Sequence, residues 1–401
     1  MKQIVDIQNT GKDRLSELVN RQRKFFNSSQ TLDISWRKSQ LIKLKKAIQN
    51  KEEAIYQALE QDLGKNWVES YASELAFVVK DIEFTLKNLK RWALPESVPT
   101  PLFLQISNSK IHYRPKGVTL IIAPWNYPFM LTLAPLVGSI AAGNCAIVKP
   151  SEDAPNTSLL IEKLLGEIYH EDFVAAVQGK GQIVVPHLMK NHRFDHVFFT
   201  GSTQVGRKIM EMASKNLSPV TLELGGKSPG IIDKNVKLKT AVKRLTWGKF
   251  YNTGQTCVAP DYLLIHEDIK QEAISLIKKY IAEFYGDDPS QSPDYGRIIH
   301  ERAFDRMLSM LDENRDDIIQ GGRTEREMRY IEPTLVEIND LNNALMKEEI
   351  FGPIWPIVSW NNEKALNELL ADHPDPLAAY MFTRDNRLWK NFLQNFSCGG
   401  A

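Results

Sequence analysis

The chain has 401 residues, of which 43% are hydrophobic and 25% are charged, and its charges nearly balance, with Lys+Arg 50 against Asp+Glu 49. At roughly 150 residues per domain, this length predicts two or three domains, and the composition is that of a soluble globular protein. The charge balance argues against a nucleic-acid partner, which would need a clustered basic surplus.

Three cysteines, Cys145, Cys257 and Cys398, are too few and too far apart for a disulfide framework or a zinc knuckle. We therefore expect no metal site, and the cytoplasm, a reducing compartment, fits this usage. Residues 1–6 lack the apolar core of a signal peptide. Glycines and an asparagine interrupt the most apolar stretch, residues 131–148, which therefore predicts buried core and not a membrane span.

The N-terminal part of the chain, up to about residue 95, has the pattern of helices. Apolar residues recur at helical spacing over residues 75–89, with charged residues between them. Asp33 stands before a lysine-rich periodic stretch, which predicts a capped helix that runs towards Asn50.

The pattern changes at Pro95. The proline-containing residues 96–101 predict a linker, and residues 102–113 predict an extended arm with a turn near Asn108. After this arm come short apolar runs, each followed by turn residues and then by a helical pattern, which is typical of βαβ units with buried parallel strands. The runs that predict strands are residues 118–122, 145–148, 196–199, 230–232 and 262–265.

Residues 251–260 carry the clearest chemical signal in the chain. A lone cysteine is most often a packing residue, and Cys145, inside an apolar strand-like run, is interpreted in that way. Cys257 differs, because small and polar residues precede it and Gly254 lets backbone amides point towards a thiolate and an oxyanion. Cys257 is therefore the candidate nucleophile, and Cys398, near the end of the chain, is given no role.

A nucleophilic cysteine usually needs a base, and the eight histidines lie in no recognisable motif. Glu223, between two leucines at a predicted strand end, is the better candidate. We expect this carboxyl to be partly desolvated, which would raise its pKa and make it a usable general base near neutral pH. The alternative, a strand glutamate that faces solvent, is favoured if the motif is taken alone.

Further polar residues follow other predicted strands. Asn126 is held between two prolines, so its amide could donate to an oxyanion, although the segment alone predicts only a proline-fixed turn. Gly201 and Ser202 lie where a strand passes into a helix, whose first amides bind phosphate well. Lys149 and Glu152 follow another strand, where a cation and an acid could hold a ribose. None of these stretches is the G-x-G-x-x-G fingerprint, so each is weak alone.

Taken together, the motifs resemble the aldehyde dehydrogenase superfamily, and they occur in that family's order over nearly the whole chain. The short helical N-terminus and the segment around Asn126 look like the class 3-like branch, whose members accept fatty and aromatic aldehydes. The segments that carry the resemblance are Pro124-Trp125-Asn126, Lys149-Pro150-Ser151-Glu152, Phe199-Thr200-Gly201-Ser202, Leu222-Glu223-Leu224-Gly225-Gly226-Lys227, Gly254-Gln255-Thr256-Cys257 and Glu349-Ile350-Phe351-Gly352-Pro353.

The resemblance implies a role for each matching residue. Cys257 would attack the aldehyde and form a thiohemiacetal, whose oxyanion Asn126 and the Cys257 amide would hold. Hydride would then pass to the nicotinamide, and Glu223 would activate the water that releases the acid from the thioester. The residues implied to bind the cofactor are Lys149 and Glu152 at the adenosine ribose, Trp125, Gly201 and Ser202 at the phosphates, and Glu349 and Phe351 at the nicotinamide side.

The same resemblance implies an α/β fold with a Rossmann-like cofactor domain, a second α/β catalytic domain and a small β-arm for oligomerisation. The NAD(P)-binding domain is expected at residues 1–95 and 118–221, the oligomerisation arm at 96–117 and the catalytic domain at 222–401. NAD is the expected cofactor, because Glu152 would repel a 2′-phosphate, while Lys149 keeps NADP open.

Family members continue past the position of residues 397–400 with a segment that completes the substrate funnel and pairs across a dimer, whereas this chain ends at Ala401. We therefore expect a homodimer if such a tail exists, and an exposed strand edge on the arm if it does not. The hypothesis is a cytoplasmic enzyme that acts on a small-molecule aldehyde, with no nucleic-acid partner and no membrane contact evident in the sequence.

Two other functions remain open from the sequence. A coenzyme A-acylating aldehyde dehydrogenase would have less need of Glu223 as a base for water. A truncated, catalytically silent protein that binds nucleotide would have no need of intact Cys257, Glu223 and Asn126. The residues therefore favour oxidation of the aldehyde to the free acid.

Overall fold

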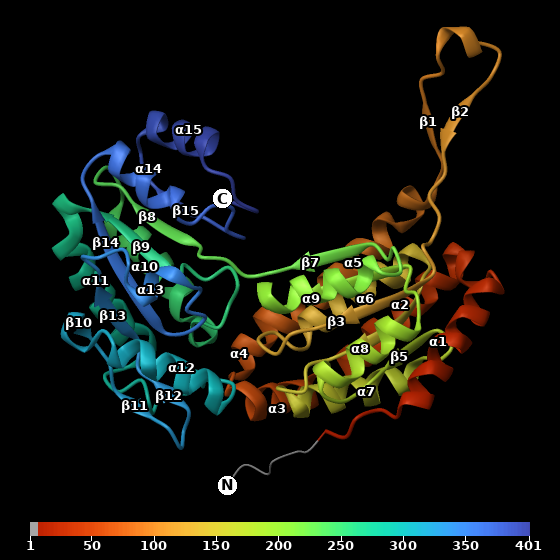
Figure 1. Cartoon of the computed structure of the whole chain (residues 1–401), viewed down its shortest axis with the longest axis horizontal. Coiled ribbons are helices and arrows are strands. Elements are labelled where there is room, and N and C mark those ends of the chain that lie inside the picture. Colours follow the sequence, from red (N-terminus) through yellow and green to blue (C-terminus); the bar gives the residue numbers. More distant parts are fainter. Residues whose placement is uncertain (1–6) are drawn as a thin grey trace. The chain divides into compact units, whose positions relative to one another are not determined.

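The computed structural model describes residues 7–401, which form two compact units (Figure 1). Within these residues, unit 1 comprises 7–62 and 67–223, and unit 2 comprises 63–66 and 224–401. Residues 1–6, to which the argument against a signal peptide applies, lie outside the described part. Over residues 7–401, no helix is both long and apolar enough to cross a bilayer. The apolar stretch 131–148 lies in a helix and a strand that are largely buried, as predicted.

Unit 1 is built on a five-stranded parallel sheet with the strand order β5-β4-β3-β6-β7. Counted along the chain this order is 3-2-1-4-5, that of a doubly wound Rossmann-like sheet. The elements of unit 1 are α1 Lys12–Asn27, η1 Gln30–Leu32, α2 Ile34–Asn50, α3 Glu52–Leu63, α4 Trp67–Ser70, the π-helical η2 Tyr71–Leu75, α5 Ala76–Ala93, β1 Glu96–Val98, η3 Leu102–Leu104, β2 Ser109–Ile111, β3 Val118–Ile122, α6 Met130–Ala142, β4 Cys145–Lys149, α7 Pro155–Ile168, β5 Val174–Ala176, α8 Gly181–Asn191, β6 His196–Thr200, α9 Thr203–Ser214 and β7 Val220–Glu223.

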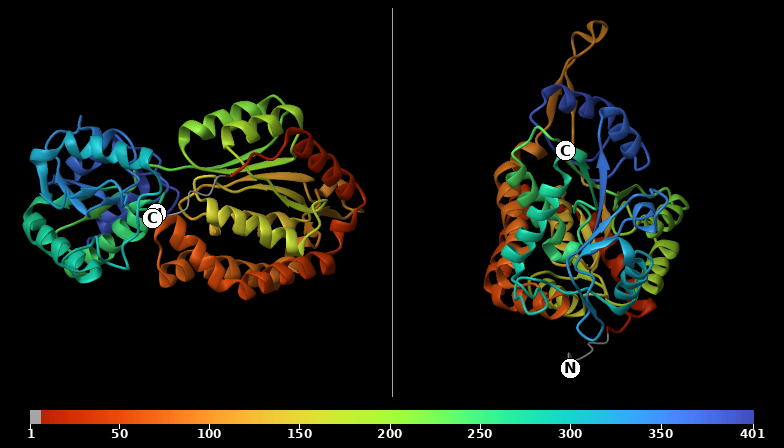
Figure 2. Two further views of the ribbon diagram at one scale, coloured as in Figure 1. Left: turned by 90° about the horizontal axis from the view of Figure 1, so that it is seen from below. Right: turned by 90° about the vertical axis from the view of Figure 1, so that its left-hand side faces the viewer.

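Helices cover both faces of this sheet, so its central strands β3 and β4 are completely buried (Figure 2). Helices α8 and α9 lie on one face, and α6 and α7 lie on the other, where α2 and α5 pack against α6. The predicted helices are confirmed: residues 75–89 belong to η2 and α5, and α2 begins after its cap Asp33. The Asp33 carboxylate accepts hydrogen bonds from the N–H groups of Ser35 and Trp36.

A buried carboxylate joins the N-terminal helices to the sheet layer. Asp62, near the end of α3, is 4% exposed. It accepts hydrogen bonds from the backbone N–H groups of Asn156 and Thr157 at 3.1 and 2.8 Å, and from both of their side chains. These two residues lie in the first turn of α7, whose amides have no partner within the helix. Asp62 therefore caps a helix that lies far from it in sequence.

The arm is an antiparallel hairpin of β1 and β2, which extends away from the sheet of unit 1 (Figure 1). The prediction of a linker over residues 96–101 is partly wrong, because Glu96 pairs with Ile111 and Val98 with Ser109. Backbone groups that a linker would leave to water are paired here across the hairpin. The 3-10 turn η3 lies between the two strands.

Unit 2 contains a six-stranded sheet with the order β10-β13-β14-β9-β8-β15, parallel except for the pair β10–β13. The strands predicted near 230–232 and 262–265 are β8 and β9. The elements of unit 2 are β8 Pro229–Ile232, α10 Leu238–Phe250, η4 Tyr251–Gly254, β9 Tyr262–His266, η5 Glu267–Ile269, α11 Lys270–Tyr285, α12 Glu301–Asp312, η6 Arg315–Asp317, β10 Ile318–Gln320, β11 Thr324–Glu325, β12 Tyr330–Ile331, β13 Thr334–Glu337, α13 Ala344–Lys347, β14 Ile354–Trp360, α14 Glu363–Ala371, β15 Tyr380–Phe382 and α15 Asn386–Asn395.

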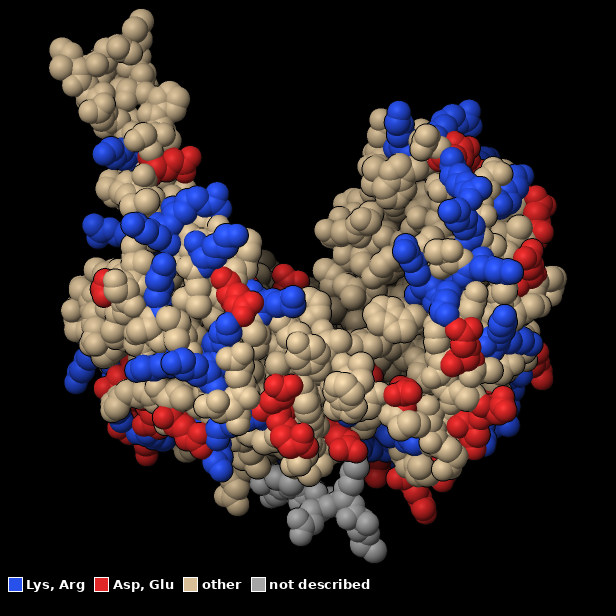
Figure 3. Space-filling view, turned by 180° about the vertical axis from the view of Figure 1, so that it is seen from behind, with Lys and Arg blue, Asp and Glu red and all other residues tan. Residues whose placement is uncertain are grey.

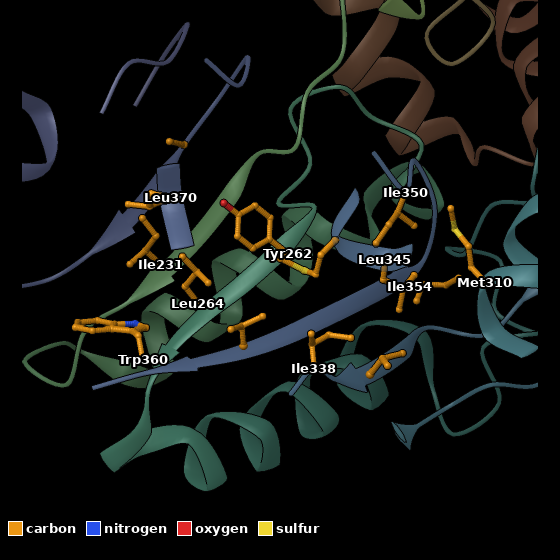
Figure 4. Packing of buried hydrophobic residues seen from close by; sticks show 14 of the residues in the cluster. Ile231, Tyr262, Leu264, Met310, Ile338, Leu345, Ile350, Ile354, Trp360 and Leu370 are labelled. Carbon is orange, nitrogen blue, oxygen red and sulfur yellow. The ribbon is translucent and has the colours of Figure 1, made fainter. Parts of the chain in front are cut away.

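The core of unit 2 anchors two of the predicted functional segments. Tyr262 at the start of β9 and Ile350 before β14 are both completely buried and belong to one apolar cluster (Figure 4). Tyr262 follows the segment of Cys257, and Ile350 is the neighbour of Glu349. Because burying such side chains stabilises by roughly 1.5–3 kcal/mol each, both segments are fixed to the same core.

Candidate active site

The predicted site residues of unit 1 gather at one edge of its sheet. The carboxyl ends of parallel strands lie at the same edge, and these residues follow β3, β4, β6 and β7. Backbone hydrogen bonds join the strand ends: Ala123 N–H donates to the Lys149 carbonyl, and Gly201 N–H donates to the Glu223 carbonyl, both at 3.0 Å. The strand order reverses between β3 and β6, so the loops after them flank the point where doubly wound sheets bind ligands.

Asn126 is 3% exposed in the turn between β3 and α6. A residue that sequence reasoning missed fixes this turn: Glu74, in η2, accepts hydrogen bonds from the N–H groups of Phe129 and Met130 at 2.9 and 3.0 Å. A carboxylate at a helix start pairs amides that the helix leaves open. Glu74 therefore holds the end of the turn that carries Asn126. No local signal marks Glu74, because Phe129 lies 55 residues away.

Lys149, the last residue of β4, is 2% exposed and is paired with Glu152. Its Nζ donates to Glu152 Oε2 at 2.6 Å and to the Pro150 carbonyl at 2.7 Å. Glu152 Oε1 accepts from the N–H of Gly181, the first residue of α8, at 2.6 Å. Burial lowers the pKa of Lys149. Burial is also the largest single influence on Glu152 and acts to raise its pKa, but Lys149 and backbone N–H groups, including that of Gly181, together lower it. The pair therefore presents a carboxylate held at the start of a helix.

Ser202 is the N-cap of α9, and its Oγ accepts from Val205 N–H at 3.4 Å. Residues 202–205 are exposed, so the first turn of this helix is open to a ligand. Gly201 has no room for a side chain, because a Cβ there would lie 2.6 Å from the Phe199 ring. The predicted passage from strand to helix is confirmed, and such a helix start can bind phosphate. Trp125, half-buried, lies after β3 at the same edge of the sheet.

Glu223, the last residue of β7, is exposed. The expectation that this carboxyl would be partly desolvated is therefore wrong. The reason is topological: β7 is an edge strand with β6 as its single neighbour in the sheet, so residues at its end face solvent. Unit 1 ends at Glu223 and unit 2 begins at Leu224, inside the motif that carries this glutamate.

Cys257 is half-buried in a turn that follows η4. The three residues Asn252, Thr253 and Gly254 before it have left-handed backbones, with φ of 50°, 56° and 74°. Two of these are not glycine, and the left-handed region costs such residues about 1–2 kcal/mol each. The loop therefore holds a conformation that surrounding contacts must enforce.

Two side chains from within unit 2 fix this loop. Gln255, completely buried, accepts from the N–H of Ile299 at 3.0 Å and donates to the Arg297 carbonyl at 3.1 Å. Tyr380 of β15 donates its O–H to the Val258 carbonyl at 2.6 Å. Gln255 and Val258, on either side of Cys257, are thus both hydrogen-bonded to residues outside the loop.

Glu349 and Phe351 lie on a segment that packs against the loop of Cys257. The two backbones touch, because a Cβ on Gly254 would clash with the Gly352 carbonyl oxygen. Phe351 also has a left-handed backbone, with φ of 53°. The predicted site residues therefore fall into two sets. Cys257, Glu349 and Phe351 lie in unit 2, and the other seven lie at the sheet edge of unit 1.

Glu349 is half-buried, and its carboxyl group lies beside a glycine pair. A Cβ on Gly225 would lie 2.0 Å from its Oε2, so a side chain at this position would require the Glu349 side chain to move. Burial, followed by the nearby Asp261, raises the pKa of Glu349 to about 8, against the opposite effect of a backbone amide and of the cations Lys227 and Arg306. At neutral pH the carboxyl is therefore largely protonated and able to donate a hydrogen bond, as is common at functional sites.

The other two cysteines differ from Cys257. Cys145 in β4 is completely buried, and burial raises the pKa of its thiol to about 12, so its interpretation as a packing residue is confirmed. Cys398 is partly buried against the core cluster of unit 2.

The strand order of unit 1, with polar residues and an open helix start at its carboxyl edge, defines a dinucleotide-binding α/β protein. Comparison with known proteins identifies the class further. The sequence model of the aldehyde dehydrogenase family matches residues 1–401. The chain belongs to this family, which confirms the resemblance carried by the motifs, and it is an oxidoreductase that oxidises aldehydes with NAD(P).

Individual relatives agree with this assignment. The chain is 45% identical over 377 residues to the 4,4′-diaponeurosporen-aldehyde dehydrogenase of Staphylococcus aureus, covering 94% of this chain and 82% of that protein. It is 41% identical over 387 residues to the dimeric NADP-preferring aldehyde dehydrogenase of Mus musculus, covering 96% and 84%. The solved substrate-bound structure of Staphylococcus aureus AldH has a TM-score of 0.94 at 44% identity, covering 96% and 84%.

Replacing Glu349 with glutamine should change how stability depends on pH. The pKa of Glu349 is raised from 4.5 to about 8, so the folded chain keeps a proton that the unfolded chain releases. The stability contributed by the neutral carboxyl is complete below pH 4.5 and is lost as the pH rises to about 8. The variant should gain more than about 1 kcal/mol over the parent between about pH 5 and about pH 8, measured by denaturant unfolding.

Glu60→Gln, an exposed glutamate on α3, is the matched control and should follow the parent. The pH range stops at about 8 because burial lowers the pKa of Lys249 from 10.5 to about 8, so that the stability linked to this lysine changes above that range. An unfolding free energy that falls equally in parent and Glu349→Gln would contradict the assignment.

Proposed function

We propose that the enzyme converts aldehydes to carboxylic acids through a covalent intermediate on Cys257. The observation that carries this proposal is the loop of Cys257: a half-buried thiol follows three left-handed residues, and Gln255 and Tyr380 hold the neighbouring residues. A chain keeps such strain where geometry matters for chemistry. The half-buried thiol is accessible enough to react, unlike Cys145.

The sequence of steps follows from the chemistry of a thiol. Cys257 attacks the carbonyl carbon, and the oxyanion is stabilised by the Asn126 amide and the Cys257 N–H. When bound, NAD(P)+ supplies the hydride acceptor that turns the thiohemiacetal into a thioester. Glu223 then takes a proton from water, which attacks the thioester and releases the acid and the thiol. Overall, aldehyde, NAD(P)+ and water give acid, NAD(P)H and a proton.

We assign the binding of the cofactor's adenosine and phosphates to unit 1, and the nucleophilic thiol to unit 2. Support for the first comes from the Rossmann-like strand order, the exposed start of α9 at Gly201 and Ser202, and the Lys149–Glu152 pair. Trp125 would line the phosphates, and Glu349 and Phe351 the nicotinamide side, where the protonated Glu349 carboxyl could donate to a ribose oxygen.

NAD is the proposed cofactor, with NADP as the alternative. A 2′-phosphate would meet the Glu152 carboxylate, and the Lys149 amine is already engaged with that carboxylate. The mouse relative is NADP-preferring by name, so both cofactors belong in every assay. The segment around Asn126 resembles that of the class 3-like branch, which favours a fatty or aromatic aldehyde as the substrate class here, and the relative from Staphylococcus aureus is named a 4,4′-diaponeurosporen-aldehyde dehydrogenase. A cytoplasmic location is proposed from the low cysteine content.

Cys257→Ala should lower aldehyde-dependent NADH production on the order of 10³-fold or more, because no other group can form the covalent intermediate. Absorbance of NADH with saturating aldehyde measures this rate. Cys398→Ala, which removes another partly buried thiol of unit 2, should leave the rate within about twofold. Retained turnover in Cys257→Ala would eliminate Cys257 as nucleophile, and NAD binding without turnover in the parent would favour the silent alternative.

Glu223→Gln should slow the release of the acid and leave hydride transfer intact. Stopped-flow mixing with aldehyde and NAD should then show a burst of NADH, close to one per active site, followed by turnover slower by about 10²-fold or more. Glu211→Gln, an exposed glutamate on α9, is the control. Turnover of the parent that requires coenzyme A would identify the acylating alternative, and a Glu223→Gln variant that behaves as the parent would exclude this base.

We infer that the arm mediates self-association, most simply as a homodimer. Residues 99–109 contain no charged side chain, and the tip of the arm is accordingly free of Lys, Arg, Asp and Glu (Figure 3). Leu102, Phe103 and Ile106 are 82%, 85% and 106% exposed. Contiguous apolar surface of this kind is typical of an interaction site.

The double substitution Phe103→Ser and Ile106→Ser should therefore shift the protein to a smaller species in sedimentation velocity. The hairpin does not belong to the core of unit 1, so the thermal midpoint of the isolated species should change little. Leu217→Ser, which replaces an apolar residue that is 83% exposed elsewhere in unit 1, is the control and should keep the mass of the parent. A parent that sediments as a monomer would contradict the inference.

A further inference from the structure

Asp261 joins three segments of unit 2 that are distant in sequence. It follows Cys257 by four residues and is 4% exposed. Its Oδ2 accepts from Lys227 Nζ at 2.5 Å, and its Oδ1 accepts from Ile350 N–H at 3.1 Å. Its own N–H donates to the Ser228 carbonyl at 2.8 Å. Asp261 thus connects three segments: the residues that lead into β8, the end of the Cys257 loop, and the residues before β14.

Two buried cations share this one carboxylate. Lys227 is 7% exposed and also donates to the Glu348 carbonyl at 3.2 Å. Lys249, at the end of α10, is completely buried, and its Nζ lies 4.0 Å from Asp261 Oδ1 without a hydrogen-bond partner among the described residues. Burying such charges is expensive, and apolar side chains of similar volume would often stabilise as much or more. The arrangement is therefore better explained by what it positions.

We propose that Asp261 is a positioning residue of the enzyme, which holds the segment of Glu349 in place through Ile350 and Lys227. This inference rests on the proposed role of Glu349 beside the nicotinamide. Arg306 also holds this segment, since its guanidinium donates to the carbonyls of Glu349 and Ile350. Asp261 supplies the acceptor for the Ile350 amide, so the backbone next to Glu349 is held through both its N–H and C=O groups.

The electrostatics agree with this geometry. The charged groups that face Glu349 are Asp261, Lys227, Arg306 and, further off, Lys249. Next to burial itself, Asp261 is the largest influence that raises the pKa of Glu349. Removing the Asp261 charge should therefore lower the pKa of Glu349 and shift any pH dependence that Glu349 gives to cofactor-dependent turnover towards lower pH.

Two reactions separate this role from that of the nucleophile. Aldehyde oxidation needs the cofactor, whereas hydrolysis of an activated ester such as 4-nitrophenyl acetate needs the thiol and a base but no hydride acceptor. The loop of Cys257 also has hydrogen bonds that do not involve Asp261, through Gln255 and Tyr380. Loss of Asp261 should therefore impair oxidation far more than ester hydrolysis.

Asp261→Asn keeps the shape of the side chain and removes its charge. We expect the kcat for aldehyde oxidation to fall by about tenfold or more, with its pH profile moved to lower pH, and ester hydrolysis to stay within about threefold. Because two buried cations would lose their counter-ion, the variant could fail to fold. Asp261→Asn combined with Lys249→Met removes one charge of each sign, and should show the same division between the two reactions.

Asp233→Asn is the matched control, because Asp233 is equally buried in unit 2 and accepts from Thr383 Oγ1 at 2.7 Å. It should leave the ratio of the two rates unchanged. Equal losses of oxidation and ester hydrolysis in the Asp261 variants, or no loss of either, would overturn the positioning role. Failure of the proposed mechanism is a different outcome, since Cys257→Ala would then retain both reactions.

Discussion

Parallel strand pairing is the constraint on which the arrangement of this enzyme depends. In the main sheet of unit 1 all five strands run in the same direction, so the residues after β3, β4, β6 and β7 meet at one edge whatever their distance along the chain. The reversal of strand order between β3 and β6 then opens a place for a ligand between neighbouring loops. Asn126 and Ser202 flank that place because of sheet topology, not because of any attraction between them.

Buried carboxylates that bind distant backbone amides complete the site. Asp62 caps α7, Glu74 caps the start of α6 after Asn126, and Asp261 binds the amide next to Glu349. In each case an amide that would be buried without a partner receives a charged acceptor, which is worth more than a neutral hydrogen bond. The same three contacts tie connections between elements to parts of the chain that are distant in sequence.

What the sequence predicts well is what depends on neighbours in the chain. The cap Asp33, the strands β3, β4 and β6 and the helix start at Ser202 follow from local pattern, and the structure contains them. The predicted desolvation of Glu223 is wrong, because its exposure depends on β7 being an edge strand. The hydrogen bond between Asp261 and Ile350 could not be predicted from local pattern, because the two residues lie 89 positions apart. The motifs located the catalytic candidates, but the contacts that hold them required the fold.

The loop of Cys257 shows why those non-local contacts matter for chemistry. Left alone, Asn252 and Thr253 would leave the left-handed region, since each gains about 1–2 kcal/mol by doing so. Gln255 opposes this with buried hydrogen bonds to residues 297 and 299, and breaking them would leave a buried amide unsatisfied at a cost of about 1–3 kcal/mol per group. The two effects are of similar size, so the position of the thiol depends on a glutamine whose side chain binds the backbone of a distant segment.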